Sequence, residues 1–255
     1  MNTKQDYIAV FDSGVGGISV LRHLRRLMPG ERYLYFGDSA NAPYGTKTKD
    51  EVEALTFAAA RRLMTRGVKA LVVACNTATS AAIHDLREAY PDTIVIGIEP
   101  ALKLAYDRYH GGGIGVMATP VTLREEKFEA LMHRYDQSCR VYKIPAPGLV
   151  ELVERGQADS PEAENLLREL FAPYQGKLDE VVLGCTHYPF AAKAISRVLG
   201  SGVALLDGGD GTARETRRRL AEADLLENGT GEVILTNSLP DEGILTLSQT
   251  LLEAQ

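Results

Sequence analysis

Short runs rich in β-branched and aromatic residues alternate along this chain with longer segments of helical period, and this alternation constrains the fold more than any other feature. The run YIAVFD at 7–12 precedes a helical segment at 18–28, and RYLYFGD at 32–38 precedes another at 50–67, which ends on Gly67. Strands separated by helices in this way form parallel sheets with helices on both faces. We therefore predict an α/β fold.

The alternation continues to the C-terminus, and no linker rich in Pro, Gly or Ser interrupts it. Further strands are predicted at 70–75, 93–98, 113–119, 140–145, 180–185 and 203–207, with 231–237 as one more candidate. Further helices are predicted at 78–90, 128–135, 149–156, 161–174, 191–199, 212–223 and near the C-terminus. We expect two similar α/β domains, each a mostly parallel sheet flanked by helices. Residues 1–97 with 208–255 would form the first domain and residues 98–207 the second.

The composition narrows the class of protein. The 255 residues are 45% hydrophobic and carry a formal net charge of −6. The densest basic cluster, at 217–219, has the pattern of a solvated helix face, so nucleic-acid binding is disfavoured. No apolar stretch has the length of a membrane span, and the N-terminus lacks the apolar region of a signal peptide. We expect a cytoplasmic globular protein whose three cysteines are reduced rather than paired in disulfides.

Two segments resemble each other and place a thiol at the end of an apolar run. VVACNTATS at 72–80 delivers Cys75, followed by Asn76 and Thr77. VVLGCTHYP at 181–189 delivers Cys185, followed by Thr186 and His187. Ligands of open parallel sheets bind beyond the carboxyl ends of the strands. If the two predicted sheets face each other, the two thiols would oppose one another across a shared cleft.

Two opposed thiols suit the inversion of a carbon centre. A thiol has a reference pKa of about 8.5, so near neutral pH it serves as a base when ionised and as an acid when protonated. One thiol would remove a proton from one side of a substrate, and the other would return a proton from the opposite side. Hydrogen-bond donors that follow the thiols, Asn76, Thr77 and Thr186, would stabilise the developing negative charge. His187 would favour the thiolate of Cys185 or hold its proton.

The cysteines also allow simpler interpretations. A single cysteine at the end of a buried strand usually serves packing, and Cys139, which has no polar neighbours in sequence, is interpreted in that way. The C-T-H segment also offers two zinc ligand types. However, two ligands separated by one residue match none of the usual zinc spacings, so no metal is expected.

The glycine-rich loop DSGVGGIS at 12–19 is a second candidate site. It follows a strand and opens a helix, so its backbone N–H groups suit an anion such as a carboxylate. The loop nearly matches G-x-G-x-x-G, with Ser19 in place of the last glycine, and Asp38 follows about 20 residues later, which leaves dinucleotide binding open. Asp12 would act as an acid or base, orient a thiol or an ammonium group, or cap a turn.

Three further segments are ambiguous by themselves. NAPYG at 41–45 offers the phenol of Tyr44 or only a turn. ATPVT at 118–122 offers two hydroxyls, Thr119 and Thr122, as helix caps or ligand contacts. Glu154 has the pattern of a solvated helix residue.

Taken together, these motifs resemble the glutamate racemases, which supply precursors of the bacterial cell wall. DSGVGG, the pair Asp38 and Ser39, PYG, CNTAT and CTHYP occur in that family's order and spacing, and the likeness covers nearly the whole chain. Two departures are Ala146, where many relatives carry a cysteine, and GGDG after Asp207. Neither departure touches the two cysteines.

The resemblance implies two α/β domains with the active site in the cleft between them. It implies racemisation of L- and D-glutamate for peptidoglycan synthesis without pyridoxal phosphate, metal or nucleotide, so no cofactor is expected. By resemblance, Cys75 takes the α-proton of D-glutamate with help from Asp12. Cys185 takes that of L-glutamate with help from His187, and Glu154 matches an acidic residue near the site.

The resemblance also implies a set of substrate contacts. The candidate substrate-binding residues are Ser13, Asp38, Ser39, Pro43, Tyr44, Gly45, Asn76, Thr77, Thr119, Thr122 and Thr186. The expected partner is the small-molecule substrate, with no membrane partner, and a homodimer is retained as an expectation. Two alternatives remain open: a racemase or isomerase of a related acid such as aspartate, and a nucleotide-binding α/β protein without enzymatic activity.

Overall fold

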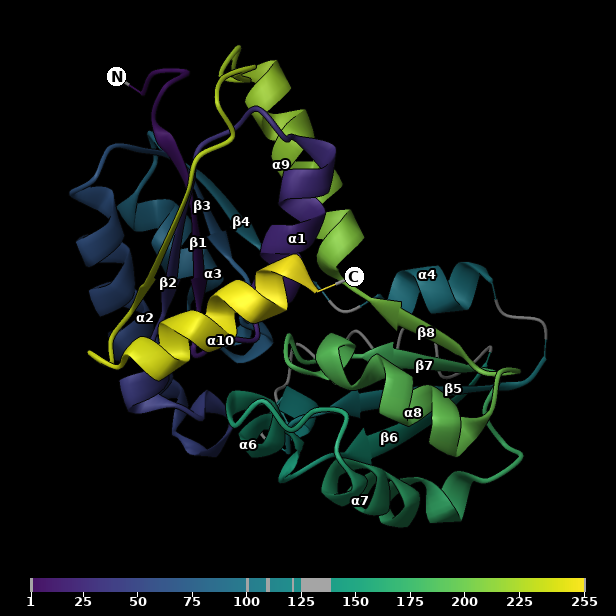
Figure 1. Ribbon diagram of the computed structural model, residues 1–255. Coiled ribbons are helices and arrows are strands. Elements are labelled where there is room, and N and C mark those ends of the chain that lie inside the picture. The colour runs from purple at the N-terminus through teal and green to yellow at the C-terminus, as the bar shows by residue number, and fades with distance from the viewer. Residues whose placement is uncertain (1, 100, 109–110, 121, 125–138, 255) are drawn as a thin grey trace. The chain divides into compact units, whose positions relative to one another are not determined.

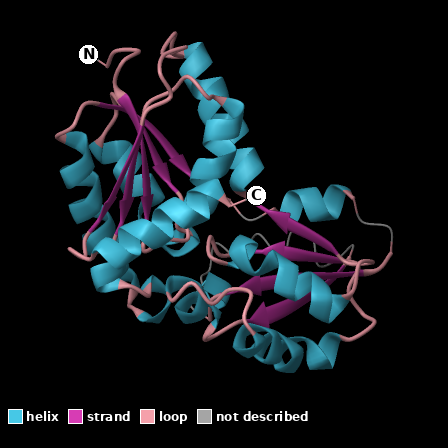
Figure 2. Ribbon diagram, in the orientation of Figure 1, coloured by secondary structure: helices cyan, strands magenta, loops and turns pink. Residues whose placement is uncertain are grey.

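The computed structural model describes residues 2–99, 101–108, 111–120, 122–124 and 139–254. The helix predicted at 128–135 lies outside these residues. The chain divides into two compact units, Met1–Glu99 with Gly209–Gln255, and Pro100–Gly208. Each unit is a parallel sheet flanked by helices, which confirms the predicted α/β fold (Figure 1 and Figure 2).

The first unit is built on a five-stranded sheet in the order β4-β3-β1-β2-β9, and all neighbouring strands in it are parallel. Its strands are β1 (Tyr7–Asp12), β2 (Tyr33–Gly37), β3 (Val68–Val73), β4 (Ile94–Gly97) and β9 (Val233–Asn237). Its helices are α1 (Ile18–Leu27), α2 (Lys49–Met64), α3 (Asn76–Ala89), α9 (Gly209–Glu222) and α10 (Glu242–Glu253). The candidate strand at 231–237 is therefore the edge strand β9, which pairs with β2.

Helices cover both faces of this first sheet. Figure 1 shows α2 and α3 on one face and α1 and α9 on the other. Phe11, Phe36 and Leu71 from the strands meet Val52 of α2 and Leu86 of α3 in one buried cluster. Because the sheet is covered twice, β3 is buried along its whole length and shows no polar alternation.

The second unit is built on a four-stranded parallel sheet in the order β6-β5-β7-β8. Its strands are β5 (Gly113–Ala118), β6 (Arg140–Pro145), β7 (Glu180–Leu183) and β8 (Ala204–Asp207). Its described helices are α4 (Leu102–Asp107), α6 (Leu149–Glu154), α7 (Pro161–Phe171) and α8 (Ala192–Leu199). Figure 2, viewed as Figure 1, shows α4 on one face of the sheet and the packed pair α7 and α8 on the other. No helix in the described part of the chain combines the length and the apolarity needed to cross a membrane.

Several elements differ from their predicted bounds. The predicted strands reached Cys75 and Cys185, but β3 ends at Val73 and β7 ends at Leu183. Cys75 is instead the N-cap of α3, where its sulfur accepts a hydrogen bond from the Ala78 N–H at 3.5 Å. The backbone therefore leaves the sheet before each thiol.

The register of the strands brings several loops to one edge of each sheet. In the first unit Asp12 pairs with Gly37, and Phe11 pairs with Val73, so β1, β2 and β3 end side by side. In the second unit Met117 of β5 pairs with Leu183 of β7. The polar segments that follow these strands therefore gather at the carboxyl edge of each sheet, where ligands of parallel sheets bind.

Candidate active site

In the first unit, Cys75 lies at the N-terminus of α3 and is 5% exposed. Its thiol donates to Ser13 Oγ, with the two atoms 3.5 Å apart. The helix macrodipole and nearby N–H groups favour a negative charge at this position, which lowers the cost of forming a thiolate.

The DSGVGG loop lies beside this thiol because β1 and β3 are neighbouring strands. Asp12 is fully buried, and its Oδ2 accepts a hydrogen bond from the Gly14 N–H at 3.1 Å. Its backbone carbonyl accepts from the Asp38 N–H at 2.9 Å. The turn from Asp12 to Gly14 is thereby held in one conformation next to Cys75.

The hydroxyl of Tyr44 has a hydrogen-bond partner within the protein. Its hydroxyl donates to Asp38 Oδ2 at 2.7 Å, and Asn41 Nδ2 lies 3.0 and 3.1 Å from the two carboxylate oxygens. Burial, and then the hydrogen bond with Asp38, raise the pKa of Tyr44 above its usual value, so the phenol stays protonated. The phenol is therefore a donor to Asp38, and Pro43 and Gly45, both half-buried, flank it. The Ser39 hydroxyl accepts from Asn237 Nδ2 of β9 at 2.9 Å.

Asn76 and Thr77 form the first turn of α3 and are both more than nine-tenths buried. The Asn76 Oδ1 atom has no hydrogen-bond donor among the residues that the structure describes. A buried acceptor without a donor is costly, and such atoms are often completed by a ligand. Asn76 is therefore the clearest polar contact that a bound molecule would satisfy.

In the second unit, Cys185 follows β7 and is 9% exposed. Its sulfur lies 3.7 Å from His187 Nδ1, and His187 Nε2 lies 2.7 Å from Glu154 Oε1 at the end of α6. Burial by itself would lower the pKa of His187, but its hydrogen bonds with Cys185 and Glu154 outweigh that effect and raise this pKa well above its ordinary value. These two hydrogen bonds therefore favour the protonated, positively charged form of the histidine beside the thiol.

Three hydroxyl residues of the second unit complete the candidates. Thr119 and Thr122 are joined by a 2.9 Å contact between their hydroxyls, and the Thr122 N–H donates to Thr119 Oγ1 at 3.3 Å. Thr186, which lies between Cys185 and His187 in the sequence, is also buried. Because β5 and β7 are neighbours, the loops that carry these residues leave the same edge of the sheet.

Two residues that take part in these networks were absent from the sequence-based candidates. Asn41 binds both oxygens of Asp38, and its position three residues after an aspartate is the signal that indicates such a turn. Tyr35 donates to the Gly14 carbonyl from within β2, where it is indistinguishable in sequence from a core residue. Among the described residues, no group of three or more His, Cys, Asp or Glu side chains is placed to hold a metal ion.

Comparison with known proteins identifies the relatives of this chain. The sequence profile of the Asp/Glu/Hydantoin racemase family matches residues 16–216. The glutamate racemase of Clostridium perfringens strain SM101 is 49% identical over 253 residues, which cover 98% of this chain and 97% of the relative.

Solved structures agree with the sequence comparison. The glutamate racemase of Thermus thermophilus, in complex with β-chloro-D-alanine, is 39% identical, with a TM-score of 0.83 over 99% of this chain and 95% of that one. The Escherichia coli glutamate racemase, in complex with L-glutamate and the activator UDP-MurNAc-ala, is 30% identical, with a TM-score of 0.86 over 96% and 95% of the two chains. These matches confirm the resemblance seen in the motifs: the chain belongs to the glutamate racemases, within the Asp/Glu/hydantoin racemase family.

Proposed function

We propose that this chain interconverts L- and D-glutamate with two thiols as the acid and base, and without a metal, pyridoxal phosphate or a nucleotide. The observation that carries the proposal is that each unit holds one buried thiol just beyond a strand, within a set of polar side chains. The relative from Escherichia coli was solved with L-glutamate bound, which supports the choice of substrate.

The surroundings of the thiols support a different role for each of them. Cys75 removes the α-proton of D-glutamate beside Ser13 and Asp12, at the N-terminus of a helix. Cys185 removes the α-proton of L-glutamate, and the positive charge of His187, held by Glu154, stabilises its thiolate. Whichever thiol has not taken the proton delivers one to the opposite side of the α-carbon, which inverts it.

The remaining candidates would bind the substrate. The Asn76 Oδ1 atom would accept a hydrogen bond from the substrate ammonium group, and N–H groups at the start of α3 and in the DSGVGG loop would bind carboxylate oxygens. Asp38, Ser39 and Pro43–Gly45 would act chiefly by shaping the loop, since Asp38 is bonded to Tyr44 and Asn41. The hydroxyls of Thr77, Thr119, Thr122 and Thr186 would complete the contacts.

Racemisation of glutamate by dialysed protein in the presence of a chelator, followed by optical rotation, tests this proposal. Cys75→Ser and Cys185→Ser should each lower kcat by about 10²–10⁴-fold, because a hydroxyl is far less acidic than a thiol. Cys139→Ser is the matched control and should keep the parent rate. Activity that requires added metal or pyridoxal phosphate, or either active-site variant near the parent rate, would refute the mechanism. Equal turnover of aspartate or glutamine would refute the substrate assignment, because unpaired donors in the site cost about 1–3 kcal/mol each.

The proposed reaction also suggests where the protein acts. D-glutamate is a building block of peptidoglycan, so the enzyme would supply cell-wall synthesis. The three cysteines are free thiols. A mechanism that depends on two of them needs a reducing compartment such as the cytoplasm.

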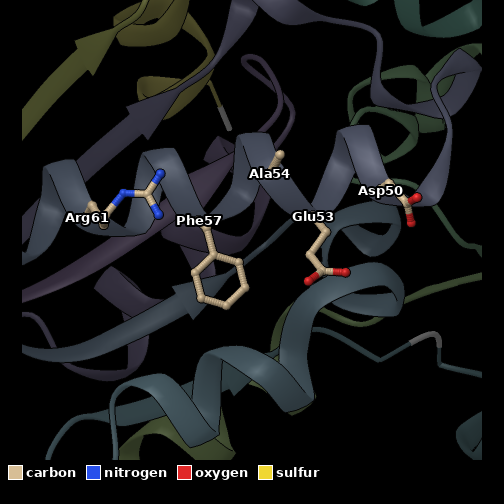
Figure 3. Close-up of a pocket in the computed structure, with 5 residues that line it drawn as sticks. All are labelled: Asp50, Glu53, Ala54, Phe57 and Arg61. Atoms are coloured by element: carbon tan, nitrogen blue, oxygen red, sulfur yellow. The ribbon is translucent and has the colours of Figure 1, made fainter.

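A homodimer is part of the proposal, and the outer face of α2 supports it. A pocket there is lined by one stripe of the helix (Figure 3), and its residues are Asp50, Glu53, Ala54, Phe57 and Arg61. Glu53 and Arg61 lie one turn to either side of the half-buried Phe57. Two copies of α2 in antiparallel contact would therefore place each Glu53 opposite an Arg61. Light scattering over a range of concentrations measures the mass, and a single-chain mass throughout would contradict a dimer.

A further inference from the structure

Tyr35 lies in the middle of β2 with its side chain fully buried. Its hydroxyl donates to the backbone carbonyl of Gly14 at 2.6 Å. This is a short, buried hydrogen bond between a core strand and the DSGVGG loop. Burying the polar hydroxyl of a tyrosine at this position carries a desolvation cost, and a phenylalanine would avoid that cost.

The carbonyl that accepts this bond belongs to the turn that meets Cys75. The Gly14 N–H donates to Asp12 Oδ2 at 3.1 Å, and Ser13, the residue between them, accepts from the Cys75 thiol at 3.5 Å. A movement of the Gly14 carbonyl would therefore move Asp12 and Ser13, the two polar groups on the Cys75 side. Gly14, Asp12, Ser13 and Cys75 all belong to the first unit.

Neighbouring elements also pack closely against this turn. A Cβ atom placed on Gly37 would lie 2.4 Å from the Gly14 carbonyl oxygen, and one on Gly17 would lie 2.5 Å from Asp12 Cβ and 3.1 Å from the Tyr35 hydroxyl. Glycines at these two positions let β2 and the start of α1 approach the turn from two sides. The Tyr35 hydroxyl then fixes the carbonyl within that space.

We propose that Tyr35 is a positioning residue for the half-reaction at Cys75, and that it acts through the Gly14 carbonyl on Asp12 and Ser13. The inference rests on the proposed two-thiol racemisation. It assigns Tyr35 to one of the two thiols, so the loss of its hydroxyl should affect the D-enantiomer more than the L-enantiomer.

Racemisation itself cannot show this asymmetry. Enantiomers have equal free energies, so the two values of kcat/KM must remain equal in any variant. A glutamate that carries chlorine on its β-carbon separates the two sides. One thiolate removes the α-proton, the C–Cl bond breaks and chloride leaves with its electron pair. The resulting enamine is hydrolysed by water to the 2-oxo acid and ammonium, without help from the second thiol.

The test compares Tyr35→Phe with Tyr33→Phe. Tyr33 is the matched control, because it is equally buried on the same strand but donates to the Leu24 and Met28 carbonyls. Tyr35→Phe should slow elimination from the D-compound on the order of tenfold and change the L-compound less than about twofold. Tyr33→Phe should affect both compounds alike. Gly37→Ala, which presses on the same carbonyl, should reproduce the D-selective loss.

An equal effect of Tyr35→Phe on both enantiomers, or no effect on either, would overturn the assignment. A loss confined to the L-compound would overturn it as well. Failure of the parent protein to racemise glutamate would instead refute the proposed function, so the two failures are distinguishable. Thermal unfolding of each variant gives the folded fraction to which the rates are normalised.

Discussion

At the scale of single residues, His187 shows how neighbouring groups shift the pKa of a buried side chain. It is almost fully buried, between the Cys185 thiol and the Glu154 carboxylate. Burial opposes the charged imidazolium, yet the two hydrogen bonds raise the pKa of His187 above its ordinary value. Because the folded pKa is raised, the charged form stabilises the fold fully below about pH 6.5, and this contribution is lost as the pH rises through the folded pKa.

Glu154→Gln should lower the pKa of His187, because it removes the adjacent negative charge. The alkaline limb of kcat/KM should then move to lower pH. The pH profile of racemisation measures this shift. Glu151→Gln is the control, because it removes an exposed carboxylate from the same helix. An unchanged alkaline limb in Glu154→Gln would show that the histidine does not govern this side of the reaction.

Sequence reasoning identified several of these residues but did not give their hydrogen-bond partners. Cys75, Cys185 and His187 were recognisable because two apolar runs end in the same pattern, a thiol followed by polar side chains. The phenol of Tyr44 was open to interpretation as a ligand contact or as part of a turn, and the structure adds that it donates a hydrogen bond to Asp38. Which partner a buried hydroxyl meets depends on contacts between distant segments, which periodicity does not report.

At the scale of elements, the segments at or beyond the carboxyl ends of parallel strands carry the candidate residues other than Glu154, which lies at the end of α6. The order of strands and helices was predictable because β-branched runs and helical periods differ clearly in the sequence. The ends of β3 and β7 were predicted two residues too late, since Val-rich runs continue to the thiols in sequence. Cys75 is the N-cap of α3, and its bond from the Ala78 N–H forms only with the helix in place, so the strand pattern does not reveal it.

A buried ion pair joins the elements at the other end of the first sheet. Lys69 of β3 and Glu31 lie 2.6 Å apart, and both side chains are fully buried. Lys69 also donates to the carbonyls of Lys4 and Leu225, and Glu31 Oε1 accepts from the Glu227 N–H. The pair therefore ties the N-terminal segment and the connection from α9 to β9 to the sheet.

Lys69→Met should lower the free energy of unfolding by about 3–5 kcal/mol, because it leaves Glu31 buried without a counter-charge. Urea unfolding measures the change. Arg218→Ala breaks two exposed ion pairs on α9 and should cost at most about 1 kcal/mol. A Lys69→Met variant as stable as Arg218→Ala would mean that the buried pair does not hold these segments.

At the scale of the whole molecule, the chain repeats one plan in two units. Each has a parallel sheet, a buried thiol beyond one of its strands, and polar groups on neighbouring loops. The surroundings differ: a serine, an aspartate and a helix N-terminus on one side, and a histidine with a glutamate on the other. Under the proposed mechanism, each thiol would serve one enantiomer of glutamate and would do so in its own surroundings.

Proton exchange in heavy water tests this central claim most directly. The two-thiol account predicts that D-glutamate formed from L-glutamate carries deuterium at its α-carbon from the first turnovers, and that L-glutamate formed from D-glutamate does so too. The remaining substrate should keep its α-proton early in the reaction, since the thiol that faces it returns the proton it took. Mass spectrometry of the separated enantiomers gives both quantities. Product that retains the substrate's proton, or substrate that gains deuterium as fast as product appears, would contradict the account.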